Sequence, residues 1–67
     1  MDRAAIGSRI KAARERAHLT QEQLAEQLQV SRQAVSKWES GQSDPSTTNL
    51  LALAKLFGVR PEELLQE

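Results

Sequence analysis

Four polar residues between positions 32 and 37 have the types and spacing of a recognition surface. They follow one another at steps of one, three and one, so a helix would place them on one face. None of them is acidic and all can form hydrogen bonds: Arg32, Gln33, Ser36 and Lys37. Arg and Lys suit paired acceptors, whereas Gln suits a donor beside an acceptor. Val35 and Trp38 would form the buried stripe on the opposite side of the same helix.

Residues for catalysis or metal binding are scarce. The chain has no cysteine and a single histidine, His18, which excludes a disulfide framework and a thiolate metal site. His18 follows Ala17 at the end of an expected helix, where an imidazole interacts well with the helix dipole and lies at the surface. No nucleophile–base pair, metal cluster or phosphate loop is present in the sequence. We therefore expect no enzyme activity, no catalytic residue, no metal and no cofactor.

Length and charge bound the remaining classes. The 67 residues accommodate one small domain, which we expect to span residues 1–67. Nine basic and nine acidic residues give a formal net charge of zero, which alone argues against a nucleic-acid partner. The charge is uneven, however: residues 1–19 sum to +3 and residues 40–67 to −2. The absence of a long apolar run or signal peptide predicts a cytoplasmic protein with no membrane partner.

The elements that would position these residues are all helical. Ile6, Ile10, Ala13 and Ala17 form one helical face of a first helix. A second helix, about Gln21 to Leu28, begins with Thr20 as N-cap and Gln23 completing a capping box. Ser31 is the expected N-cap of a third helix, and Gly41 its left-handed end residue.

Two further helices complete the chain. Ser46 is the favoured N-cap of the fourth, with Asp44 as the alternative, and Gly58 ends this helix. Its apolar positions are Leu50, Leu53, Ala54 and Phe57. Pro61 suits the first turn of a fifth helix. Because no segment alternates like a strand, the fold class predicted is a compact, all-α, five-helix domain.

Two short helices joined by about three residues suggest a helix-turn-helix at about residues 20–39. The stretch LTQEQLAEQLQVSRQAVSKWESG resembles the helix-turn-helix of the lambda-repressor and Cro family of bacterial and phage regulators, also called XRE-like. The resemblance extends from about Ile6 to Leu65. It implies a lambda-repressor-like fold and sequence-specific binding of double-stranded DNA by a cytoplasmic transcriptional regulator, a repressor in preference to an activator.

The resemblance also assigns roles to individual residues. The third helix would enter the major groove and contact bases through Arg32, Gln33, Ser36 and Lys37. The position of Gln21 contacts the DNA backbone in the family, and the free N–H groups at that helix start favour a phosphate. Ser31 would cap the third helix and contact phosphate as well. Arg14 and Glu39 occupy positions that the family commonly joins in a structural ion pair.

Some positions depart from the family pattern. Gln29 stands in the turn where glycine is usual because the backbone is left-handed. Gln42 and Ser43 stand where relatives often place a cation against phosphate, which predicts weaker affinity and a shallower salt dependence. The neutral loop and the zero net charge leave open an alternative: an antitoxin-like or adaptor module that uses the same fold to bind protein.

The number of chains on DNA is the last expectation. One recognition helix reads only a few base pairs, which gives little specificity in a genome. Relatives bind palindromic operators as two-fold dimers. Leu51, Leu56 and Leu65 are apolar residues outside the expected core stripes. We therefore expect a weak homodimer that forms largely on a palindromic operator.

Overall fold

The computed structural model describes residues 3–65 and contains five α-helices. They are α1 (Arg3–Arg16), α2 (Gln21–Leu28), α3 (Arg32–Ser40), α4 (Thr47–Phe57) and α5 (Pro61–Leu65). No strand occurs in this part of the chain, so the predicted all-α, five-helix class is confirmed. The predicted domain limits, 1 and 67, lie outside the described residues.

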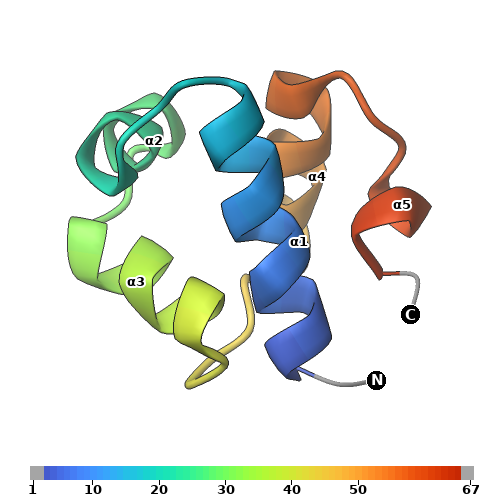
Figure 1. Cartoon of the computed structure of the whole chain (residues 1–67), viewed down its shortest axis with the longest axis horizontal. Helices are drawn as coiled ribbons and strands as arrows, with labels where there is room; N and C mark the ends of the chain where they lie inside the picture. Colours follow the sequence, from blue (N-terminus) through green and yellow to red (C-terminus); the bar gives the residue numbers. More distant parts are fainter. Residues whose placement is uncertain (1–2, 66–67) are drawn as a thin grey trace.

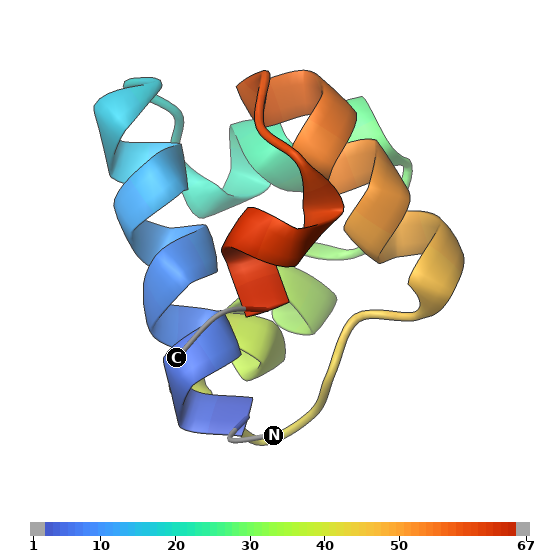
Figure 2. The same ribbon diagram turned by 90° about the vertical axis from the view of Figure 1, so that its right-hand side faces the viewer.

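In Figure 1 the α2–α3 pair lies on one side of the molecule and α5 on the other, with α1 in front of α4 between them. The most extensive packing is between α1 and α3, followed by that between α2 and α3. Helix α5 contacts both α1 and α4, and Figure 2 shows it crossing in front of the space between them. The helix-turn-helix is therefore held mainly through α1, while α4 and α5 close the other side.

The core takes a fully buried side chain from each of the four longer helices. Ile10, Leu24, Val35 and Leu53 are 0% exposed and come from α1, α2, α3 and α4 in turn. Leu64 of α5 is 3% exposed and joins the same cluster. Ala25 is 3% exposed, which fits a small side chain where α2 meets its neighbours. Apolar burial thus links all five helices into one core.

Side-chain caps begin three of the helices. Thr20 Oγ1 accepts from Gln23 N at 3.0 Å, and Gln23 Oε1 accepts from Thr20 N at 2.8 Å, which is the predicted capping box. Ser31 and Ser46 cap α3 and α4 through bonds from Ala34 N and Asn49 N. Ser46, rather than the alternative Asp44, is therefore the N-cap of α4.

Four helices end in the same way, with one left-handed residue followed by a residue whose N–H bonds back five positions. The left-handed residues are His18, Gln29, Gly41 and Gly58. The matching bonds run from Leu19 to Arg14, Val30 to Ala25, Gln42 to Lys37 and Val59 to Ala54. Sequence analysis identified the two glycines and Gln29. It missed His18, because its side chain gives no signal of a positive φ.

The predicted placement of Ala17 on one helical face with Ile6, Ile10 and Ala13 is wrong. Ala17 is exposed, whereas Ile6, Ile10 and Ala13 of the same expected stripe are buried. Helix α1 ends at Arg16, and the backbone then turns through His18 at φ 58°. The helical periodicity stops before Ala17, so its side chain no longer follows the stripe toward the core.

Gly7 marks the closest approach of α1 to α3. A Cβ atom at this position would overlap the carbonyl oxygen of Trp38 and lie 2.8 Å from that of Glu39. Both atoms belong to the backbone of α3, which cannot move aside as a flexible side chain could. Gly7 therefore lets the two helices pack at a distance that no other residue type would allow.

Candidate nucleic-acid interface

The outward side of α3 carries the four polar residues that the sequence predicts for base contact. Arg32, Gln33 and Lys37 are exposed and Ser36 is partly exposed. Together with Gln42, which follows the helix, they line one shallow hollow. The structure therefore brings Arg32, Gln33, Ser36 and Lys37 together, and we call these four residues the reading face.

The opposite side of α3 fixes the orientation of this face. Val35 is 0% and Trp38 is 5% exposed, so both side chains are anchored in the core. Ser31 caps the start of the helix, and Gly41, at φ 82°, ends it. Because both ends and the inner stripe are fixed, the reading face is held on a rigid element.

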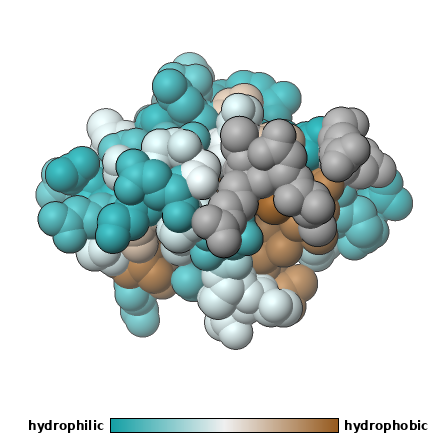
Figure 3. All heavy atoms as spheres, turned by 90° about the horizontal axis from the view of Figure 1, so that it is seen from below, coloured by the Kyte–Doolittle hydropathy of each residue, from teal (hydrophilic) through white to brown (hydrophobic). Residues whose placement is uncertain are grey.

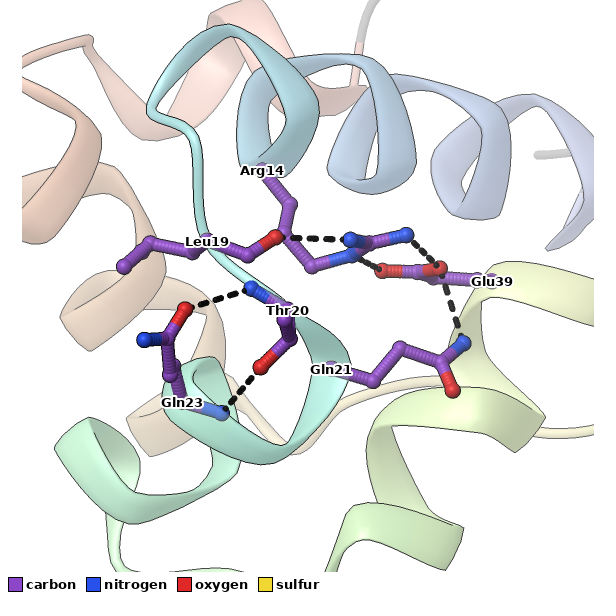
Figure 4. A network of polar contacts seen from close by, with 6 residues as sticks. All are labelled: Arg14, Leu19, Thr20, Gln21, Gln23 and Glu39. Carbon is purple, nitrogen blue, oxygen red and sulfur yellow. Dashed lines mark hydrogen bonds and ion pairs between the residues drawn. The ribbon is translucent and has the colours of Figure 1, made fainter.

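Arg14 and Glu39 form a two-pronged ion pair between α1 and the last turn of α3 (Figure 4). Arg14 Nε donates to Glu39 Oε2 at 2.7 Å, and Arg14 Nη2 donates to Glu39 Oε1 at 3.1 Å. Arg14 Nη1 donates to the carbonyl oxygen of Leu19 at 2.7 Å. The side chains are 12% and 4% exposed. This pair ties the α1–α2 connection and α3 to the same guanidinium.

The electrostatics of this pair favour the charged form of Arg14. The hydrogen bond to Glu39, supported by the charges of Glu39 and Glu15, raises the pKa of the Arg14 guanidinium, although desolvation acts in the opposite direction. A raised pKa of a cation stabilises the fold at every pH below its ordinary value, and the contribution is lost only as the pH rises through the raised value. Arg14 therefore contributes its full stabilisation at neutral pH.

Gln21 and Ser31, which the sequence predicts for phosphate contact, lie at the starts of α2 and α3. Gln21 Nε2 donates to Glu39 Oε1 at 3.1 Å, so one amide hydrogen is held by the ion pair (Figure 4). Its second amide hydrogen remains for another acceptor. Ser31 Oγ accepts from Ala34 N at 3.1 Å and keeps its own hydroxyl hydrogen. Both residues thus have a structural partner and a donor left over.

Sequence reasoning missed two features of this interface. The Gln21–Glu39 bond joins residues 18 positions apart, and no periodicity relates them. The close approach at Gly7 was also missed, because the sequence shows only a glycine of low helix propensity. Each depends on how α1, α2 and α3 pack, which residue spacing within one helix does not reveal.

No three histidine, aspartate or glutamate side chains of residues 3–65 gather where they could hold a metal ion. Within the same range, every helix is too short or too polar to cross a membrane.

Comparison with known proteins places this chain in a family. A family model described as helix-turn-helix matches residues 10–64. Over 48 residues the chain is 58% identical to the "HTH-type transcriptional activator BcrR" of Enterococcus faecalis. The matched segment covers 72% of this chain and 24% of that protein.

Solved structures agree in shape. The restriction-modification controller protein C.AhdI from Aeromonas hydrophila matches with a TM-score of 0.86 and 35% identity, over 94% of this chain and 96% of that one. The P22 c2 repressor in complex with a synthetic operator matches with a TM-score of 0.83 and 37% identity, over 88% and 89%.

The chain belongs to the helix-turn-helix family of the lambda-repressor and Cro type, a family of DNA-binding transcription regulators. The predicted family is therefore confirmed. The chain spans only 24%, 44% and 31% of the length of three curated relatives that it matches, in Enterococcus faecalis, Escherichia coli and Salmonella phage P22.

Proposed function

We propose that this chain binds double-stranded DNA sequence-specifically, with α3 in the major groove, and thereby regulates transcription. The observation that carries the proposal is the reading face: three exposed side chains and one partly exposed side chain on one side of a helix whose other side is buried. A single α-helix fits the major groove of B-DNA, where each base pair presents a distinct set of donors and acceptors. Family membership supports the same assignment.

The chemistry of the reading face matches base edges. Arg32 and Lys37 suit the O6 and N7 acceptors of guanine, and Gln33 suits the donor and acceptor of adenine. Ser36 can donate to or accept from any base. Among the residues that the structure describes, no acidic one lines the hollow in front of α3. The reading face can therefore approach the bases without a carboxylate that would repel the neighbouring phosphates.

Phosphate contacts would position α3 in the groove. Gln21 and Ser31 each keep a donor hydrogen beyond the bond that holds them in place. Both stand at helix starts, where backbone N–H groups and the dipole favour an anion. In this proposal they bind the sugar-phosphate backbone beside the reading face, which fixes register but not sequence.

We further propose that the chain is a single helix-turn-helix domain over residues 1–67 and acts as a repressor on a palindromic operator. The named P22 repressor, matched over most of this chain, supports repression, whereas the Enterococcus relative is named an activator. Expression of a reporter gene whose promoter contains the operator distinguishes repression from activation. Repression predicts lower transcription with the intact operator than with a scrambled one.

Selection of random duplex DNA, followed by anisotropy titration with the selected site, tests binding itself. We expect affinity for the selected duplex to exceed that for a scrambled duplex by about 10³-fold or more and to fall as salt is raised. Equal affinity for both duplexes would exclude sequence-specific reading. Absence of any salt-dependent duplex binding would exclude DNA binding and favour the protein-binding alternative.

A further inference from the structure

A second hollow lies next to the reading face, on the side of α1. Its lining comes from three helices, and Ser36 is shared with the hollow in front of α3. The residues are Lys11, Arg14, Gln21, Ser36, Glu39 and Ser40. We call it the α1 hollow. Because Ser36 borders both hollows, a partner seated on the reading face also faces the α1 hollow.

The charges of the α1 hollow favour an anion despite the presence of Glu39. Both carboxylate oxygens of Glu39 accept hydrogen bonds, from Arg14 and from Gln21, and its side chain is only 4% exposed. The positive charge of Arg14 is paired with Glu39. Lys11 is the remaining charged residue of the lining, and it is exposed. An approaching phosphate therefore meets an ammonium group rather than the carboxylate.

Gln21 adds a directional donor to this ammonium. Its Nε2 gives one hydrogen to Glu39 Oε1, which fixes the plane of the amide and leaves the second hydrogen for another acceptor. The side chain reaches from the start of α2 toward the last turn of α3 (Figure 4). An ammonium and an oriented amide in the same hollow suit one phosphate group.

We propose that Lys11 contacts a phosphate of the DNA backbone when α3 occupies the major groove, so that α1 is part of the DNA-binding surface. This inference rests on the proposed function. Lys11 lies outside the helix-turn-helix segment at about residues 20–39, and nothing in that motif points to it. Lys11 would then provide a positive charge near the DNA backbone, where relatives often use a cation at the positions of the neutral Gln42 and Ser43.

The test compares Lys11→Gln with Lys55→Gln, which removes an equal charge from another exposed lysine, on α4. Lys55 lines neither the α1 hollow nor the hollow at the reading face. Affinity for a selected duplex and for a scrambled duplex is measured by anisotropy from about 50 to about 200 mM salt. If Lys11→Gln loses one phosphate contact, the affinity of the wild type relative to this variant should fall about threefold as salt is raised across this range.

We expect Lys11→Gln to weaken both duplexes equally and to reduce the salt slope by about 0.9, while Lys11→Arg keeps the wild-type slope. Lys55→Gln should match the wild type. A Lys11→Gln slope equal to that of Lys55→Gln, with the wild type still binding duplex DNA, overturns this inference alone. Failure of the wild type to bind duplex DNA overturns the proposed function together with it.

Discussion

Glu39 accepts three hydrogen bonds although its side chain is almost completely buried. The donors are Arg14 Nε, Arg14 Nη2 and Gln21 Nε2, from two different helices. A buried carboxylate is costly unless its lone pairs are satisfied and its charge is paired, and both conditions are met here. Glu39 therefore joins the stability of the fold to the orientation of a residue proposed to contact DNA.

Removing either partner of this pair should destabilise the fold strongly. Arg14→Ala or Glu39→Ala leaves a desolvated charge and should cost about 3–5 kcal/mol of unfolding free energy. Thermal and urea melts of both variants and of the double variant measure the coupling. The exposed Glu22→Ala variant is the control and should cost less than about 1 kcal/mol, because it removes only a favourable charge from the first turn of α2.

Additive losses in the Arg14 and Glu39 cycle would remove the ion pair as a source of stability. Because the total stability of a chain of 67 residues is roughly 3–10 kcal/mol, the alanine variants can be largely unfolded. Glu39→Gln and Arg14→Lys preserve more of the hydrogen bonding and provide a milder cycle. They should show coupling of the same sign.

Substitutions on the reading face should alter base preference and leave stability unchanged. Gln33→Ala or Lys37→Ala removes a base contact and should cost about 1–3 kcal/mol at the selected site. Both side chains are exposed, so the melting temperature should stay close to that of the wild type. Gln27→Ala, on the exposed side of α2, is the matched control and should bind normally. Unchanged preference and affinity in both variants would place base reading elsewhere.

At the scale of elements, Gly7 determines how closely α1 and α3 pack. Helix propensity alone predicts that Gly7→Ala stabilises the protein by about 1 kcal/mol. The overlap with backbone oxygens of α3 predicts the opposite, a net loss of about 1–3 kcal/mol, with weaker DNA binding because α3 is displaced.

Urea unfolding of Gly7→Ala beside Ser8→Ala separates the two effects on helix α1. Ser8 is exposed and neighbours Gly7, so its replacement should change only propensity, with a gain of a few tenths of a kcal/mol at most. A Gly7→Ala protein as stable as the wild type would show that the helices separate without cost.

The sequence predicts elements better than it predicts contacts between them. The Thr20 capping box and the Ser31 cap are local, so residue spacing was sufficient to find them, whereas the left-handed Gln29 was expected from the family resemblance. His18 was missed because its side chain gives no signal of a positive φ, and the bond from Leu19 N to Arg14 O involves only the backbone. The Gln21–Glu39 bond and the Gly7 contact required the packing of three helices. The residues of the reading face were found because they lie on a single helix.

At the scale of the whole molecule, the apolar residues proposed for dimerisation differ in exposure. Leu51 is 52% and Leu56 is 36% exposed, whereas Leu65 is partly buried and packs against the core. Viewed from below, hydrophobic surface is also exposed on the side of α5 (Figure 3). The accessible part of the proposed interface is thus mainly on α4, and it is small.

Size supports weak association on DNA. Half-sites of a palindrome are centred about 34–36 Å apart, and the longest extent of this molecule is 26 Å. Two copies on adjacent half-sites would therefore meet only at their edges. Sedimentation should show a monomer at micromolar concentration and two chains on a saturated palindromic duplex. Leu51→Lys should weaken cooperative binding to the palindrome while preserving affinity for a single half-site.

One chain per saturated palindrome would contradict the dimer, and a nanomolar dimer without DNA would contradict its weakness. The control for Leu51→Lys is Lys55→Ala, which changes an exposed position of the same helix. Ala52→Lys would not serve, because Ala52 is partly buried. The Lys55→Ala variant should retain cooperative binding.

The burial of Trp38 makes the protein its own fluorescent reporter. Trp38 is the single tryptophan, and the chain has no tyrosine, so emission excited at wavelengths longer than phenylalanine absorbs arises from one place. The indole lies in the core on the inner side of α3, and the Trp38 carbonyl borders Gly7. Its emission should shift to longer wavelength when α1 and α3 separate and water reaches the ring. Since the ring points away from the reading face, the same emission should change little on binding DNA, which lets one optical signal follow folding independently of recognition.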